Sequence, residues 1–114
     1  MITKKLEDLK AGANPHGVDA RNLYDTEAAV ITAITLKPGQ SLKRHVTPVD
    51  VAFYVLEGRG DVEIGEERTE VGKDTLVESP KGIMHCLYNT GHEDFRVLVV
   101  KAPRPSAKTV FPKG

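Results

Sequence analysis

The sequence is poor in cysteine and carries no net charge, and each shortage excludes a class of protein. Cys86 is the only cysteine among 114 residues, so no disulfide can form within the chain. Small secreted scaffolds normally depend on disulfides, and the sequence therefore favours a cytoplasmic protein. Sixteen lysines and arginines balance sixteen aspartates and glutamates. This balance leaves no net field to attract nucleic acid or an anionic membrane, so neither is expected as a partner.

Long hydrophobic runs are also missing. The strongest apolar cluster, VLVV at residues 97–100, is far too short to span a bilayer. The first ten residues, MITKKLEDLK, contain no continuous apolar stretch, so we do not expect a signal peptide. The chain does contain 39% hydrophobic and 28% charged residues, a balance typical of a globular protein. Its length suits one domain over residues 1–114.

Short strands separated by turns dominate the pattern and predict an all-β fold. Apolar and β-branched segments recur about every 8–12 residues, and turn sequences such as KPGQ, GRG and SPKG end them. No segment between the strands has the length and period of a crossover helix. We expect the core barrel to span about residues 28–101, with a helix and loop over 1–22 and a proline-rich tail over 102–114.

The start of the chain carries the only helical signal. Ile2, Leu6 and Leu9 recur at helical spacing. Thr3 can cap such a helix and Gly12 can end it. The pattern predicts a short helix of about two turns.

The segment VAFYVLE, residues 51–57, is apolar on both of its faces because strand residues alternate between them. One face carries Val51, Phe53 and Val55, and the other carries Ala52, Tyr54 and Leu56. A strand that is apolar on both sides is usually buried on both sides. If one face lines a barrel interior, the other needs a cover from outside, and a homodimer would supply it.

Two histidines stand where two predicted strands begin. His45 lies in the segment SLKRHV, and His85 follows the turn made by Pro80 and Gly82. Histidine is suited both to metal binding and to acid–base work near neutral pH. The two side chains could converge in one barrel mouth.

These residues resemble the first motif of the cupins, small barrels of the jelly-roll or double-stranded β-helix type. That motif runs glycine, five residues, His-x-His, three or four residues, glutamate, six residues, glycine. The chain has Gly39, His45 and Gly58 in this register. It departs at two positions: Thr47 replaces the second histidine and Val51 replaces the glutamate.

The second cupin motif is more complete. It ends Pro-x-Gly-x-x-His-x-x-x-Asn, and the chain matches every position through Pro80, Gly82, His85 and Asn89. The glycine expected six residues before the proline is replaced by Asp74. The resemblance covers roughly residues 28–101 and implies a cupin barrel.

The resemblance implies metal-ligand roles for His45 and His85 alone. Thr47 offers only a neutral hydroxyl, and Val51 cannot bind a metal. A zinc, iron or manganese site normally takes at least three protein groups. We therefore expect at most one weakly held divalent ion, zinc, manganese, nickel or iron. Asp50 is a conceivable third ligand, but its alternation with Val51 points it outward.

Three interpretations of the histidine pair stay open. The two rings form a weak metal pair completed by water or substrate, they are metal-free groups that bind an organic ligand or transfer protons, or they are core histidines satisfied by hydrogen bonds. His16, in the early loop, could cover a barrel mouth. The predicted ligand pocket consists of Lys43, His45, Thr47, Phe53, His85 and Asn89.

The fold does not fix the function, because cupins include enzymes, binding modules and storage proteins. Our leading hypothesis is a small-molecule-binding cupin with a degenerate two-histidine metal site. The alternative is a metal-dependent cupin enzyme, an isomerase or oxygenase that acts on a small polar substrate.

Overall fold

The computed structural model describes residues 1–112, and its regular structure is almost entirely β. The elements are η1 Leu6–Asp8, a 3₁₀ turn, and the strands β1 Asp19–Asp25, β2 Val30–Leu36, β3 His45–Val46, β4 Asp50–Glu57, β5 Gly60–Ile64, β6 Glu67–Val71, β7 Leu76–Ser79, β8 Met84–Tyr88 and β9 Phe95–Ala102. The all-β prediction is confirmed.

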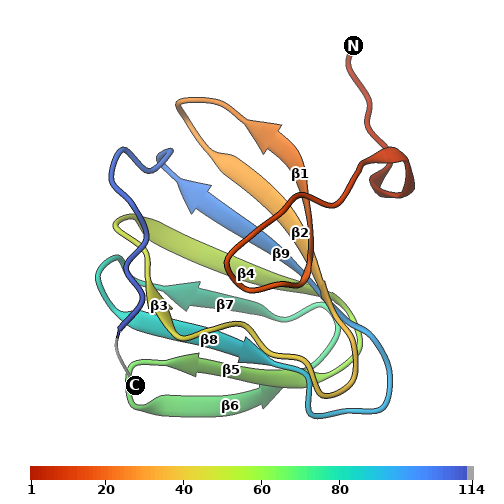
Figure 1. The fold of residues 1–114 in the computed structure, drawn as a ribbon, viewed down its shortest axis with the longest axis vertical. Coiled ribbons are helices and arrows are strands. Elements are labelled where there is room, and N and C mark those ends of the chain that lie inside the picture. The colour runs from red at the N-terminus through yellow and green to blue at the C-terminus, as the bar shows by residue number, and fades with distance from the viewer. Residues whose placement is uncertain (113–114) are drawn as a thin grey trace.

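The strands form two sheets stacked over a shared interior (Figure 1). One sheet has the order β1-β2-β9-β4-β7, and the other has the order β3-β8-β5-β6. Neighbouring strands run antiparallel in both sheets. Because sequence neighbours such as β4 and β5 lie in different sheets, the chain passes repeatedly between the two layers.

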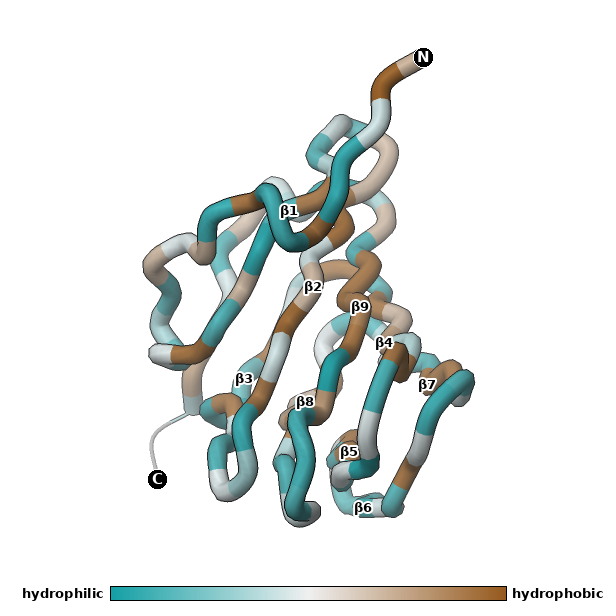
Figure 2. Tube along the Cα trace, turned by 90° about the vertical axis from the view of Figure 1, so that its right-hand side faces the viewer, coloured by the Kyte–Doolittle hydropathy of each residue, from teal (hydrophilic) through white to brown (hydrophobic). Residues whose placement is uncertain are grey.

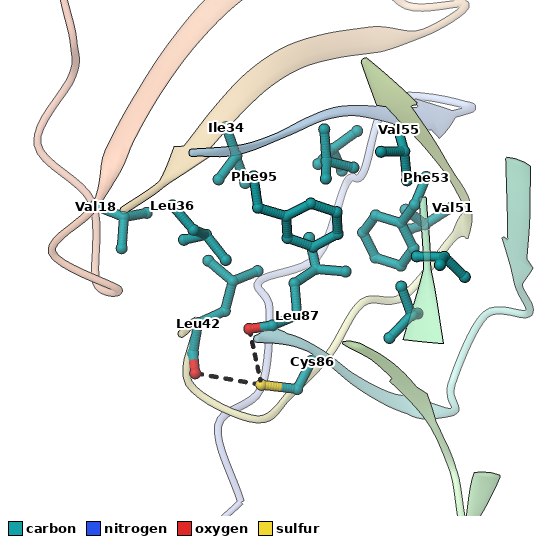
Figure 3. Packing of buried hydrophobic residues seen from close by; sticks show 14 residues of the cluster. Val18, Ile34, Leu36, Leu42, Val51, Phe53, Val55, Cys86, Leu87 and Phe95 are labelled. Carbon is teal, nitrogen blue, oxygen red and sulfur yellow. Dashed lines mark hydrogen bonds between the residues drawn. The ribbon is translucent and has the colours of Figure 1, made fainter. Parts of the chain in front are cut away.

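Alternation along the strands places the hydrophobic core between the sheets. Phe53 on β4 and Phe95 on β9 lie side by side in this interior, facing Leu87 of the other sheet (Figure 3). Figure 2 shows hydrophobic stretches along β2 and β9, with hydrophilic turns at the strand ends. The core also includes Cys86, whose thiol donates a hydrogen bond to the carbonyl of Leu42 at 3.2 Å.

Two turn positions of the motifs restrict which residue can stand there. Gly58 has a φ of 79°, and a Cβ atom at this position would overlap the carbonyl oxygen of Asp94. Asp74, which replaces a motif glycine, has a φ of 63° and is the one non-glycine residue with a positive φ among residues 1–112. Aspartate tolerates this left-handed conformation better than most residues. The turn is therefore kept although the glycine is lost.

The N-terminal region differs from the prediction in two ways. The helical element is present, but it is a three-residue 3₁₀ turn rather than two turns of helix, and no side chain caps it. Leu6 and Leu9 are only partly buried, so little packing supports a longer helix. The strands also begin earlier than residue 28, because β1 pairs along β2 from Asp19 onward.

The C-terminal tail crosses the end of the barrel beside β3 (Figure 1). The backbone of Val110 exchanges two hydrogen bonds with Val46, at 2.7 and 2.9 Å. This bridge fixes the described part of the tail next to the histidine pair. Residues 1–112 form only one helical element, of three residues, and therefore contain no candidate membrane-spanning helix.

Candidate functional site

The two histidines of the motifs lie directly opposite each other on neighbouring strands. His45 on β3 pairs in register with His85 on β8. Their Nε2 atoms are 2.9 Å apart, and both residues are buried. The expected convergence of the two rings is what the structure shows.

Hydrogen-bond partners determine where the protons of this pair lie. The Nδ1 atom of His45 is 2.7 Å from the carbonyl oxygen of Lys43, which can only accept, so His45 carries its proton on Nδ1. The Nε2 atom of a neutral His45 is then an acceptor, and His85 donates to it from Nε2. The Nδ1 atom of His85 consequently accepts a hydrogen bond from the Ser79 hydroxyl at 2.7 Å. A polar chain thus runs from buried Ser79 through both rings to the surface.

Thr47 completes the surroundings of His85. It is almost fully buried, and its Oγ1 lies 3.1 Å from Nε2 of His85. The hydroxyl shares the region between the two rings and offers a weak, neutral oxygen where the cupin motif has a second histidine.

His16 and Phe111 cover the pair from the solvent side. The ring of His16 lies 4.7 Å from that of His45, measured between centroids, and its Nδ1 accepts the backbone N–H of Lys43 at 2.8 Å. The ring of Phe111, from the tail, lies 5.5 Å from His16 and 5.8 Å from His45. The early loop and the tail therefore meet over the barrel mouth.

A cavity of about 200 Å³ opens at this mouth. Its apolar lining includes Ile34, Leu42, Phe53, Val99 and Phe111. Its polar lining includes His16, Thr32, His45, Lys101 and Thr109. An apolar wall with a few polar groups is the usual lining of a small-molecule site, and the volume is below that of sites for drug-sized ligands.

The histidines of the site are neutral near neutral pH. Burial first, and then the neighbouring His45 and Lys101, lower the pKa of His85 from 6.5 to about 3. Burial, and then His45 and Lys43, lower the pKa of His16 from 6.5 to about 4. Burial also lowers the pKa of His45, although the hydrogen bond to the Lys43 carbonyl opposes this shift. Lys101 is the one lysine or arginine that lines the cavity in the described structure.

Of the six residues of the predicted ligand pocket, four lie outside the cavity lining: Lys43, Thr47, His85 and Asn89. Thr47 and His85 are close to His45 but do not line the cavity. Lys43 is exposed, and it contributes through its backbone, which holds His16 and His45. Asn89 is buried, but its amide donates to the carbonyls of Leu36 and Glu93, at 2.9 and 2.7 Å. Asn89 therefore ties the β8 end to neighbouring loops, because its hydrogen-bonding groups are already occupied.

The structure also shows the positions of Phe53, Asp50 and His16, three other residues considered from the sequence. Phe53 lines the cavity as predicted. Asp50 points outward, as its alternation with Val51 suggested, and accepts the backbone N–H of Lys81 at 2.9 Å. His16 lies at the barrel mouth, although its place in a loop gave no periodic signal.

Sequence reasoning missed much of the site, including Ser79, Lys101 and Phe111. Lys101 continues the inward alternation of Val97 and Val99 on β9, so strand parity could have found it. Ser79 immediately precedes the proline of the second motif, which was a weaker signal. Nothing in the sequence placed Phe111, because the tail reaches the site through a single backbone bridge.

The donor set does not fit a resident divalent metal. Two bonds of about 2.1 Å at a right angle would place two nitrogens about 3 Å apart, so the spacing of His45 and His85 alone would suit a metal. Within residues 1–112, however, no group of three histidine, cysteine or acidic side chains could hold an ion. Thr47 adds only a neutral hydroxyl, and the nearby Lys101 is a cation. We therefore derive no chemistry through a metal.

With this geometry established, comparisons with known proteins place the chain in a family. The profile of the cupin domain family matches residues 32–101, which is more than half of the chain. The chain belongs to the cupin family. The match confirms the family and barrel type that the two motifs implied. This cupin also retains the glycine frame of the first motif around positions where the metal ligands are replaced.

Individual relatives extend the comparison. The structure of TT1209 from Thermus thermophilus is 33% identical, covers 92% of this cupin and 100% of that chain, and has a TM-score of 0.79. Protein SCO3923 of Streptomyces coelicolor is 37% identical over 57 residues, which are 50% of this cupin and 53% of that protein. The match therefore spans about half the length of this curated relative.

The polyketide cyclase RemF of Streptomyces resistomycificus shows the same fold at lower identity. It is 22% identical, covers 100% of this cupin and 87% of that chain, and has a TM-score of 0.85. Similarity at this level establishes a shared fold alone. The fold thus supports enzymes elsewhere, without assigning an activity to this cupin.

Proposed function

We propose that this cupin binds a small organic molecule in the barrel-mouth cavity, beside a histidine pair that has lost the ligands of a metal site. The observation that carries the proposal is the cavity itself. It is about 200 Å³ in volume and combines apolar walls with the polar edges of His16 and His45.

The histidine pair suits hydrogen bonding better than ion binding. Because His85 donates to His45, the two Nε2 atoms satisfy each other without a metal between them. A ligand in the cavity would meet the rings of His16 and His45, which line it, while His85 stabilises His45 from behind. The pair then holds the ring of His45 in place, so that the bound molecule can pack against it.

The proposal can be tested by titrating the protein with benzamide, a small neutral compound that has an apolar ring and a polar group. NMR signals of the His16 and His45 rings should shift saturably as the cavity fills. Thr32→Phe, which adds bulk to the cavity lining, should weaken this binding. Thr69→Phe is the matched control, because Thr69 is exposed on β6 and lies outside the cavity lining.

Histidine signals that do not move in the parent, or that move equally in Thr32→Phe, would contradict the proposal. Circular dichroism and the melting temperature of each variant establish that the fold is kept. A shift in the parent that only the cavity substitution removes is the predicted outcome.

The second candidate function is a metal-dependent enzyme, an isomerase or oxygenase of a small polar substrate. The spacing of 2.9 Å between the two Nε2 atoms favours it. Such an enzyme would need its remaining ligands from water or substrate. Metal content separates the two functions, because the enzyme requires a stoichiometric ion.

A further inference from the structure

We propose that the molecule bound in the barrel-mouth cavity is a small organic monoanion, and that Lys101 binds its carboxylate. This inference rests on the proposed function, since it names the chemical class of the ligand. It assigns Lys101 a binding role that neither motif of the sequence carries.

Lys101 points into the barrel because of its place on β9. Val97 and Val99 are buried on the inward face, and Lys101 follows them at the next inward position. It lies directly opposite Val51 on β4 and Val30 on β2. The side chain lines the cavity, and most of it is shielded from solvent.

No negative charge in the described structure balances Lys101. Among residues 1–112, no carboxylate lies within ion-pair distance of its ammonium group, and no acidic residue lines the cavity. Its direct neighbours in the two strand pairings are valines. Burial without a partner disfavours the charged form, and it lowers the pKa of Lys101.

The positive charge of Lys101 also affects the protonation of the three histidines of the site. Lys101 lines the same cavity as His16 and His45, and its charge contributes to the lowered pKa values of His16, His45 and His85. A divalent cation would meet repulsion here, whereas an anion would offset the uncompensated charge. The cavity is therefore electrostatically suited to a negative ligand.

Hydrogen bonding points to a single carboxylate. The Nδ1 atom of His16 already accepts the backbone N–H of Lys43, so a neutral His16 carries its proton on Nε2. That N–H has no protein acceptor among residues 1–112 and can donate to one carboxylate oxygen. A single ammonium beside neutral donors matches a monoanion better than a phosphate dianion, which would keep an uncompensated charge.

The rest of the ligand is apolar. Ile34, Leu42, Phe53 and Val99 form walls with no polar side-chain atoms, and the ring of Phe111 lies at the mouth. The volume of about 200 Å³ limits the molecule to a small one. A compact hydrocarbon or aromatic body with one carboxylate fits these constraints.

The inference is tested by comparing benzoate with benzamide at pH 7, because the two differ mainly in charge. Binding is followed by the NMR signals of His16 and His45 in the parent, in Lys101→Met and in Lys73→Met. Methionine is an unbranched side chain close to lysine in length, and it carries no charge. Lys73 is the matched control, because it is exposed in the turn between β6 and β7 and its substitution removes the same net charge.

The parent should bind benzoate roughly tenfold more tightly than benzamide, as a charge-assisted contact would give. Lys101→Met should lose this preference and still bind benzamide, whereas Lys73→Met should keep it. Equal affinity of the parent for both compounds overturns the inference and leaves the proposed function intact. A preference for benzoate that survives in Lys101→Met also overturns it. If neither compound moves the histidine signals of the parent, the inference and the proposed function both fall.

Discussion

Val51 stands between two residues that control the histidine pair. Val51 lies on β4, between strands β7 and β9. Its partner on β7 is Ser79, whose hydroxyl donates a hydrogen bond to His85, and its partner on β9 is Lys101. The position that carries glutamate in the cupin motif is therefore within reach of the site, and here it holds a buried aliphatic side chain. This arrangement predicts how a metal site could be restored.

Thr47→His together with Val51→Glu should create metal-dependent stability that the parent lacks. The two substitutions add an imidazole and a carboxylate beside His45 and His85, and binding to the native state alone stabilises it by about 2.7 kcal/mol at a metal concentration a hundred times Kd. Melting temperatures measured with added zinc, manganese, nickel or iron(II) check this gain.

Lys101 should limit the metal-dependent stabilisation of this double variant, because its ammonium group can form an ion pair with the glutamate introduced at position 51 on the neighbouring strand. Adding Lys101→Met to the double variant should therefore raise its metal affinity further. Equal stabilisation of the parent by any of these metals would show that an unrecognised ligand already completes the site.

The shielded histidines His16 and His85 should make stability depend on pH below about 6.5. The folded-state pKa values of His16 and His85, about 4 and about 3, lie below the 6.5 of an unperturbed histidine. The unfolded chain thus binds more protons in this range. Stability should be complete above about pH 6.5 and should fall as the pH drops towards 4.

Urea denaturation of the parent and of His16→Asn at pH 5, 6 and 7 measures this effect. The amide oxygen of asparagine can still accept the Lys43 N–H, but the side chain does not titrate. The free energy of unfolding should decline less steeply in the variant. Identical slopes in both proteins would mean that His16 does not titrate differently on folding.

At the scale of secondary structure elements, the tail depends on one backbone bridge. The N–H of Val110 donates to the carbonyl of Val46 at 2.9 Å, and this contact brings Phe111 over the mouth. Val110→Pro removes the donor, so the tail should detach and expose the bond after Lys108 to trypsin.

The rate of tryptic cleavage after Lys108, followed by mass spectrometry, checks this prediction. Val110→Ala is the control, because it shortens the side chain but keeps the N–H. Cleavage should be faster in the proline variant than in the alanine variant and the parent. Equal rates in all three would indicate that the bridge does not hold the tail.

At the scale of the whole molecule, the outer face of the five-stranded sheet is unusually apolar. Tyr54 lies between Leu76 on β7 and Leu98 on β9, and Leu76 is 54% exposed. Ala52, Tyr54 and Leu56 are only partly buried within one chain. Contiguous apolar patches are uncommon on monomers, so we predict that a second copy covers this face.

Light scattering should therefore give about twice the chain mass of 12.5 kDa at micromolar concentration. Leu98→Glu places a charge in the predicted interface and should shift the mass towards the monomer. Thr69→Glu, at an exposed position on β6, should leave the mass unchanged. A parent mass of 12.5 kDa would contradict the dimer.

Local patterns in the sequence predicted most of the fold and part of the site. Alternation in the strands and the fixed spacing of the motifs located β4, β8 and the convergence of His45 and His85, because such signals are periodic and local. The pairing of the two histidines across neighbouring strands was not predicted. The arrangement around Lys43 and Asn89 could not be foreseen, since their roles depend on backbone contacts with distant loops. The tail was unpredictable for the same reason.

The central claim is that this barrel mouth holds an organic molecule rather than a metal ion. Elemental analysis of protein purified without an affinity tag tests it most directly, because a resident metal would remain bound at a stoichiometry near one. Two imidazoles beside an ammonium group should leave zinc, manganese, nickel and iron far below one per chain. One metal ion per chain that survives dialysis against a chelator would contradict the claim.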